Sequence, residues 1–87
     1  MGSLNLSSPA LAADNYINGL KSIEKKIYAF ETDRISRLEF LNEVKYIAEF
    51  LQLEEFLTYI YKNKDPDPQL MLGLVWYYED SLLSNNS

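Results

Sequence analysis

Hydrophobic residues recur every three or four positions along most of the chain, a pattern that predicts α-helices. The first run, with spacings of 4, 3, 4 and 3 residues, consists of Tyr16, Leu20, Ile23, Ile27 and Phe30. Upstream, Ser8-Pro9 combines a hydroxyl N-cap with Pro at the first helical position, so we expect this helix to begin there, with Asp14 as an alternative start. Gly19 within the run weakens the helix by about 1 kcal/mol relative to Ala.

A capping box marks the start of a second helix. In Ser36-Arg37-Leu38-Glu39 the Ser36 hydroxyl can accept a hydrogen bond from the Glu39 amide, while the Glu39 carboxylate reaches back. Ile35 before the cap and Phe40 after it have the spacing of a hydrophobic staple. We therefore predict a turn at residues 32–35 and a helix from Arg37.

The end of this second helix is open to two interpretations. One face carries Phe40, Leu41, Val44, Ile47, Ala48 and Leu51. In a straight continuation the opposite face would carry Leu53, Phe56, Leu57 and Ile60. This change of face favours a break near Gln52, followed by a short third helix from about Glu54 to Lys62. Because no Gly or Pro marks the break, one long helix clamped between two layers remains the alternative.

A loop and a last helix complete the pattern. Residues 63–68, Asn-Lys-Asp-Pro-Asp-Pro, predict a loop because two prolines in three residues exclude a continuing helix. Asp67-Pro68 repeats the cap-plus-Pro start, and we expect the last helix to end at about Leu83. The predicted fold is all-α, a small antiparallel helical bundle of three or four helices. Residues 1–7 would be a flexible lead-in, residues 8–84 a single domain and residues 85–87 a frayed tail.

The last helix is apolar on more than one side, since eight of the nine residues 70–78 are apolar or aromatic. The stripe predicted to face the core comprises Leu70, Met71, Leu74, Val75, Tyr78 and Leu82. Leu72, Trp76 and Leu83 form a second stripe roughly 100–200° away. A chain of 87 residues offers little to cover that side, so we expect a homodimer or partner protein to bind Leu72, Trp76, Leu83 and the neighbouring Tyr77. The alternative is that the helix is central and that Trp76 belongs to the core.

Five tyrosines lie wholly or partly off the predicted core faces, namely Tyr28, Tyr46, Tyr59, Tyr61 and Tyr77. Tyrosine combines a large apolar body with a polar tip, which suits hydrated interfaces. These residues add to the expectation of a protein-binding surface.

The composition excludes several chemistries. The chain has no His and no Cys, which excludes Ser-His-Asp sets, thiol nucleophiles and ordinary zinc sites. The carboxylate pairs Glu39/Glu43 and Glu54/Glu55 are typical of a solvated helix surface rather than of an acid–base pair. Residues 65–69 resemble the opening of a calcium loop, but the Gly and Glu required further on are missing. We therefore expect no enzymatic activity, no cofactor, no metal and no small-molecule substrate.

The formal net charge is −5, and it is uneven, +1 over residues 1–37 and −6 over residues 38–87. This balance argues against nucleic acid as a partner, because phosphate binding requires Lys and Arg. An alternative hypothesis follows from the acidic half: a small inhibitor, immunity or antitoxin-like, of a basic nuclease or nucleic-acid-binding protein. Its acidic contacts would be Glu49, Glu54, Glu55, Asp65 and Asp67.

No segment approaches the roughly 18 uninterrupted apolar residues of a membrane span. The first residues lack the basic and apolar regions of a signal peptide. We therefore expect no membrane partner and a cytoplasmic location. The leading hypothesis is a non-enzymatic interaction or regulatory module that self-associates or docks on a partner through its last helix.

Overall fold

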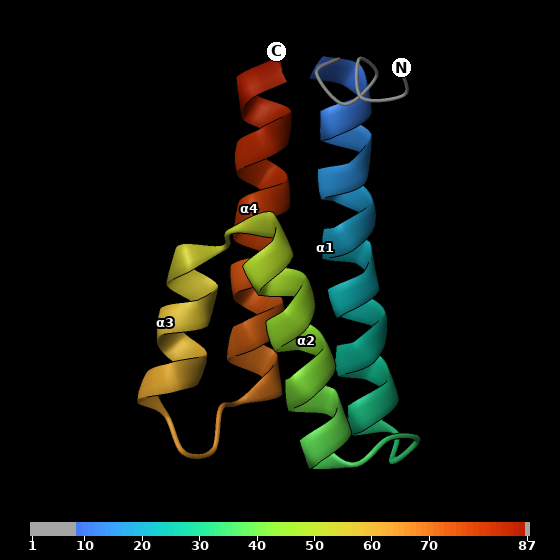
Figure 1. Ribbon diagram of the computed structural model, residues 1–87, viewed down its shortest axis with the longest axis vertical. Coiled ribbons are helices and arrows are strands. Elements are labelled where there is room, and N and C mark those ends of the chain that lie inside the picture. Colours follow the sequence, from blue (N-terminus) through green and yellow to red (C-terminus); the bar gives the residue numbers. More distant parts are fainter. Residues whose placement is uncertain (1–8, 87) are drawn as a thin grey trace.

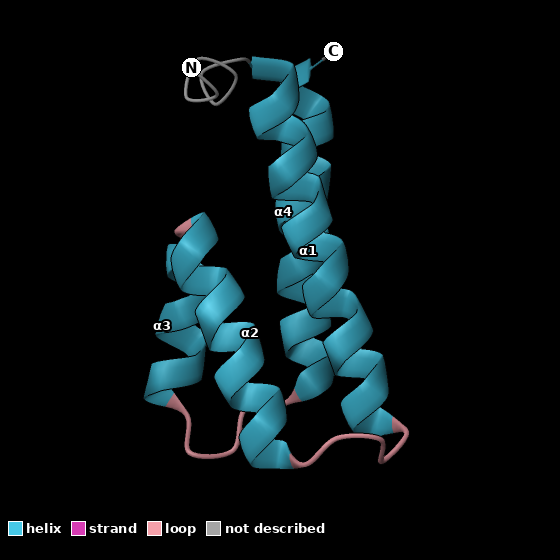
Figure 2. Cartoon of the chain, turned by 45° about the vertical axis from the view of Figure 1, so that its right-hand side comes forward, coloured by secondary structure: helices cyan, strands magenta, loops and turns pink. Residues whose placement is uncertain are grey.

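The computed structural model describes residues 9–86, which form four helices: α1 (Pro9–Glu31), α2 (Arg37–Leu51), α3 (Glu54–Lys62) and α4 (Pro68–Asn86) (Figure 1). Consecutive helices run antiparallel (Figure 1). The contacts pair α1 with both α2 and α4, and pair α3 with the same two helices. The predicted all-α bundle is confirmed, with the first and last described residues at the same end of the molecule (Figures 1 and 2).

The side-chain caps predicted at Ser36 and Asp67 form, and of the capping box the hydrogen bond to the Ser36 hydroxyl is present. The Ser36 hydroxyl accepts a hydrogen bond from the Glu39 amide at 3.1 Å, and α2 begins at the next residue after Ser36. The Asp67 carboxylate accepts one from the Gln69 amide at 2.9 Å and caps α4. The first helix begins at Pro9, and its predicted cap, Ser8, lies outside the described residues.

The last helix continues to Asn86, so the predicted end at Leu83 is too early by three residues. Ser84, Asn85 and Asn86 include neither Gly nor Pro. Each residue added to an existing helix gains a backbone hydrogen bond, and weak helix formers therefore extend a helix that nothing stops. The predicted lead-in at residues 1–7 and the last residue, Ser87, lie outside the described part of the chain.

The break between α2 and α3 is confirmed, and a backbone turn at Gln52 produces it. Gln52 adopts the left-handed conformation, with φ 60° and ψ 46°. The amide of Leu53 donates back to the Ala48 carbonyl at 2.9 Å, which closes the end of α2. Glycine usually occupies this position, and for other residues the left-handed conformation costs about 1–2 kcal/mol. The turn offsets that strain by directing Leu53 and Phe56 into the core.

The core lies between the four helices. Its buried members are Leu20, Ile23 and Ile27 from α1; Phe40, Val44 and Ala48 from α2; Leu53, Phe56 and Ile60 from the α3 region; and Met71, Leu72 and Val75 from α4. The faces predicted for the first three helices are confirmed. For α4 the prediction is wrong at two positions, because Leu72 is 4% exposed and Leu70 is 56% exposed. The spacing of apolar residues did not determine the rotation of a helix that is apolar on nearly all sides.

Helices α1 and α4 extend past the corner where α2 turns into α3 (Figures 1 and 2). The corner is level with Gly19, where an added Cβ would lie 2.5 Å from Leu51 Cδ1. It is also level with Tyr78, whose hydroxyl accepts hydrogen bonds from the amides of Glu55 at 3.1 Å and Phe56 at 3.3 Å. The same hydroxyl donates to the Glu55 carboxylate at 2.7 Å. Beyond this level, α1 and α4 pack mainly on each other within the described structure.

The two helical glycines should respond differently to replacement by alanine. Gly73→Ala should raise the free energy of unfolding by about 0.5–1 kcal/mol, because alanine favours the helix and a Cβ at this position meets nothing within 4 Å. Gly19→Ala should give a smaller gain or a loss, because Leu51 must move. Urea denaturation at low protein concentration measures both values. An equal gain at both positions would contradict the close approach of Leu51 to α1.

Candidate protein-docking surface

The residues predicted to bind a partner differ in their exposure to solvent. Trp76 and Tyr77 are exposed, by 52% and 61%. Leu72 is a core residue, 4% exposed, so the prediction that it anchors a partner is wrong. The side chain of Leu83 lies outside the described part of the structure, and its predicted role stays a prediction.

Two residues that the sequence analysis did not select complete the exposed surface. Leu70 and Gly73 are exposed together with Trp76 and Tyr77. At 100° per residue these four positions span an arc of about 120° on one side of the helix, with Gly73 near its centre. We call this set of residues the α4 face. One signal in the sequence does mark it, since residues 68–78 carry no charge.

Contacts with α1 fix the rotation of α4. The side-chain amide of Gln69 donates to Glu31 at 2.5 Å near one end of the pair, and Lys21 lies 3.7 Å from Glu79 further along it. At 100° per residue, Glu79 lies about 20° from Leu72, whereas Gln69 lies between Trp76 and Gly73. The contacts with α1 therefore border the Trp76 edge of the α4 face, and the exposed Leu70, Gly73 and Tyr77 lie further from α1 around the helix.

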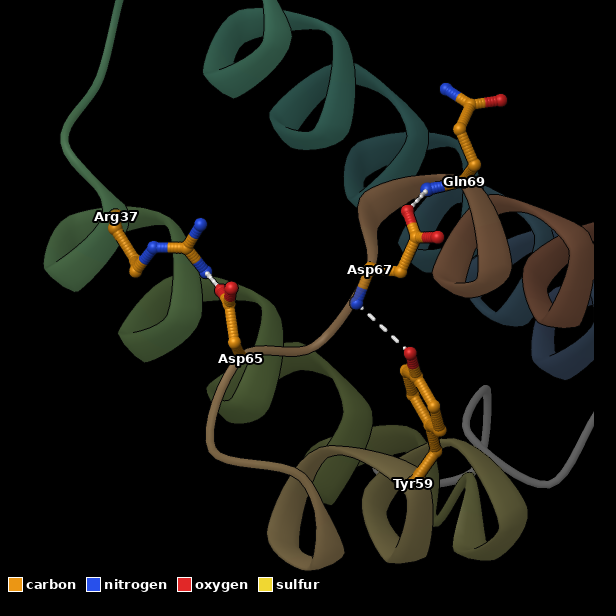
Figure 3. A network of polar contacts seen from close by, with 5 residues as sticks. All are labelled: Arg37, Tyr59, Asp65, Asp67 and Gln69. Carbon is orange, nitrogen blue, oxygen red and sulfur yellow. Dashed lines mark hydrogen bonds and ion pairs between the residues drawn. The ribbon is translucent and has the colours of Figure 1, made fainter.

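The loop before α4 is held by polar contacts with α2 and α3 (Figure 3). Arg37 at the start of α2 forms an ion pair with Asp65, with 2.5 Å between Nη1 and Oδ1. The Tyr59 hydroxyl accepts a hydrogen bond from the Asp67 amide at 2.9 Å. Pro66 between them is buried. These contacts fix the position of the first turn of α4 relative to α2 and α3. The α4 face begins in this first turn, at Leu70.

The acidic residues of the inhibitor hypothesis do not form one surface. Glu49, Glu54 and Glu55 lie near the corner that begins α3, whereas Asp65 and Asp67 follow the other end of that helix. Several of them hold the fold together, since Glu49 accepts from the Tyr61 hydroxyl at 2.7 Å and Glu55 from Tyr78. The structure therefore brings the predicted acidic contacts together in two groups rather than one.

Other exposed aromatic side chains are distributed over the remaining helices. Tyr28, Tyr46 and Tyr61 are exposed, as expected, while Tyr59 is partly buried against the core. Phe50 on α2, 76% exposed, was not selected from the sequence. None of these helices matches the uncharged surface of α4, because charged residues interrupt each of them.

Within residues 9–86 no group of three or more potential metal-ligating side chains occurs, and none of the helices described there has the length and apolar character to cross a membrane. A shallow hollow of about 410 Å³ near the end of α1 is lined by Lys25, Tyr28, Ala29, Thr32 and Arg34. This lining contains no carboxylate to act as a general base.

Comparisons with protein-family models, with curated proteins and with solved structures found no match to this chain. Functional inference therefore rests on the residues and geometry described above.

Two carboxylates meet at the contact between α1 and α4. Lys21 Nζ lies 3.8 Å from Glu24 Oε2 and 3.7 Å from Glu79 Oε1, and both carboxylate side chains are largely buried. Burial, and then the neighbouring Glu24 carboxylate, raise the pKa of Glu79 to about 7 against the opposing effect of Lys21. One lysine thus lies beside two carboxylates, and with a pKa of about 7 the Glu79 carboxyl is about half protonated at neutral pH.

This pair should make stability depend on pH. Glu79 titrates near 4.5 when unfolded and near 7 when folded, so the folded state binds more protons between these values. The free energy of unfolding should therefore fall as the pH rises from 4.5 to 7. Glu79→Gln should raise stability by about 1–3 kcal/mol at pH 8 and flatten this dependence.

Urea denaturation across a pH series tests this prediction at low protein concentration. Asp80→Asn is the matched control, because it removes one negative charge from an exposed position on the same helix. If both variants have the same pH dependence, the Glu24–Glu79 contact does not produce the effect.

Proposed function

We propose that the protein is a non-enzymatic interaction module whose partner protein docks on the α4 face. The observation that carries the proposal is the exposure of Trp76 and Tyr77 in a stretch of helix, residues 68–78, that carries no charge. Tryptophan and tyrosine are the residues most enriched at the energetic centres of protein interfaces. Charged residues are depleted at those centres, which the uncharged stretch reproduces.

The grouping of these side chains distinguishes them from ordinary surface aromatics. Single exposed hydrophobic residues are common on soluble proteins and need no explanation. Here Leu70 lies two turns before Trp76 and Tyr77, and the glycine between them has no neighbouring side chain above it. The result is an apolar strip of Leu70, Trp76 and Tyr77 with no side chain at its centre, where Gly73 lies.

The rest of the described chain does not cover this strip. Helix α4 packs against α1 on one side and α3 on the other, and the core already contains Met71, Leu72 and Val75. Rotating α4 to bury Trp76 would bring Met71, on the far side of the core face, toward the surface. The exposure of Trp76 and Tyr77 therefore follows from how the core is filled, and no described residue covers them.

A photo-cross-linking amino acid at position 77 tests the proposal in cells that naturally produce the protein. Tyr77 replaced by a benzophenone-bearing residue should form a covalent adduct with whatever docks on the α4 face. The matched control is the same replacement at Tyr46, which is exposed by 73% on α2. We expect a discrete adduct from position 77 and little from position 46. Equal adducts from both positions, or none from position 77, would contradict the proposal.

A further inference from the structure

We propose that Glu24 and Glu79 share one proton across the contact between α1 and α4, and that losing this proton lets the ends of these two helices separate. The inference concerns a different part of the molecule from the α4 face and does not depend on the proposed function. It follows from the burial of both carboxylates, from the single lysine beside them and from their place at the base of two helix ends that extend past α2 and α3.

The two carboxylates lack hydrogen-bond donors. Each side chain is 14% exposed, and within the described structure the buried atoms Glu24 Oε2 and Glu79 Oε2 have no hydrogen-bond partner. Lys21 Nζ lies 3.8 Å and 3.7 Å from the two carboxylates, further than the roughly 2.7–3.2 Å of an N–H···O hydrogen bond. Buried polar atoms are normally hydrogen-bonded, so this pair requires an explanation.

A single proton supplies the missing donor. An ionised carboxylate only accepts hydrogen bonds, whereas a protonated carboxyl also donates one. With one proton on the pair, Glu79 donates to Glu24, and the one remaining negative charge lies beside Lys21. Burial is the main cause that raises the pKa of Glu79 to about 7, and the hydrogen bond with Glu24 is the next. Without the proton, two buried negative charges face one lysine.

The surroundings of the pair do not neutralise a second negative charge. From α1, Lys21 and Glu24 face Glu79. Helix α3, which also packs on α4, brings a further carboxylate to this level, Glu55, bonded to the Tyr78 hydroxyl. The charged residues of the helix stretches 9–24 and 78–86 are one lysine and four acids, namely Lys21, Asp14, Glu24, Glu79 and Asp80. Ionisation of Glu79 therefore adds charge to a region that is already acidic.

The pair is placed where repulsion acts on the helix ends. It lies close to the level of the corner between α2 and α3, beyond which α1 and α4 pack mainly on each other (Figures 1 and 2). The apolar side chains described there, Tyr16, Ile17 and Leu82, are only partly buried. On the other side of the pair both helices belong to the buried core. Segments with few buried neighbours open at the lowest free energy, so the ends separate while the rest of the bundle stays folded.

The sign and size of the pH dependence follow from the same proton. When the ends separate, Glu79 meets water and its pKa returns from about 7 to its ordinary value of 4.5. The separated state thus binds fewer protons between these values, and its equilibrium population rises with pH. Complete separation of the pair predicts a rise in the opening constant of roughly 50–100-fold from pH 5 to pH 8, with little change above pH 8.

Pairs of spin labels measure the separation directly, because the chain has no cysteine of its own. Since Lys21 lies opposite Glu79, Asn15→Cys and Asn85→Cys place two labels at one level beyond the pair. Pulsed electron paramagnetic resonance should give one short distance at pH 5 and a second, longer population at pH 8. Labels at Tyr28→Cys and Gly73→Cys, which are level on the core side of the pair, should give one distance at both pH values.

Charge-removing variants identify the groups responsible. Glu79→Gln and Glu24→Gln should each keep the Asn15–Asn85 label pair at the short distance at pH 8, because one negative charge then faces Lys21 and the glutamine amide supplies a donor. Asp80→Asn is the matched control, since it removes a charge from an exposed position next to Glu79. This control should separate with pH as the original chain does. A response that is lost equally in all three variants would indicate a general charge effect and contradict the shared proton.

Amide hydrogen exchange tests the unlabelled chain. Residues 80–84 should lose protection as the pH rises, after correction for the intrinsic exchange rate, and the loss should depend little on low urea concentrations because local opening exposes little surface. In Glu79→Gln this loss of protection should be absent.

The two parts of the proposal fail separately. The carbon-13 resonance of the Glu79 carboxyl should titrate near pH 7, and a midpoint near 4.5 would exclude the shared proton. A neutral midpoint with one unchanged label distance from pH 5 to pH 8 would overturn the separation of the helix ends. Cross-linking at position 77 tests the docking function independently of both results.

Discussion

The antiparallel contact between α1 and α4 determines which side of α4 meets water. Hydrophobicity alone leaves that choice open, because almost every side chain in the first half of α4 is apolar. Hydrogen bonding between Gln69 and Glu31 and the ion pair between Lys21 and Glu79 define one flank. Once that flank faces α1, Met71, Leu72 and Val75 enter the core, and Trp76 and Tyr77 are left outside. The rotation that places Met71, Leu72 and Val75 in the core is thus also the one in which these polar contacts form.

Most of the architecture could be predicted from local signals. The Ser36 N-cap, the Asp67-Pro68 start and the double proline act within a few residues, and the helices begin and end accordingly. The core faces of α1, α2 and α3 follow equally from periodicity, because each of those helices has one apolar side and one charged side. In such helices only one side is apolar enough to be buried, and the spacing of apolar residues is sufficient to predict that side.

The features that escaped prediction depend on contacts between distant residues. Leu70 was predicted to be buried and Leu72 to be exposed, and the structure shows the reverse. The rotation of α4 depends on its packing against α1, which lies about 40–50 residues earlier. The end of α2 lacks the glycine that normally marks such a turn, and Gln52 adopts the left-handed conformation in its place. The significance of Gly73 was also hidden, since a glycine in a sequence does not indicate whether a neighbour fills its space, as Leu51 does at Gly19. Of the candidate surface, Trp76 and Tyr77 were found in advance, but its outline required coordinates.

The two long helices bring the first and last described residues to one pole of the molecule, beyond the corner formed by α2 and α3. The α4 face lies nearer the opposite pole, in the half of α4 that follows the Asp67 cap. Anything fused to either terminus would therefore project away from this face without covering it.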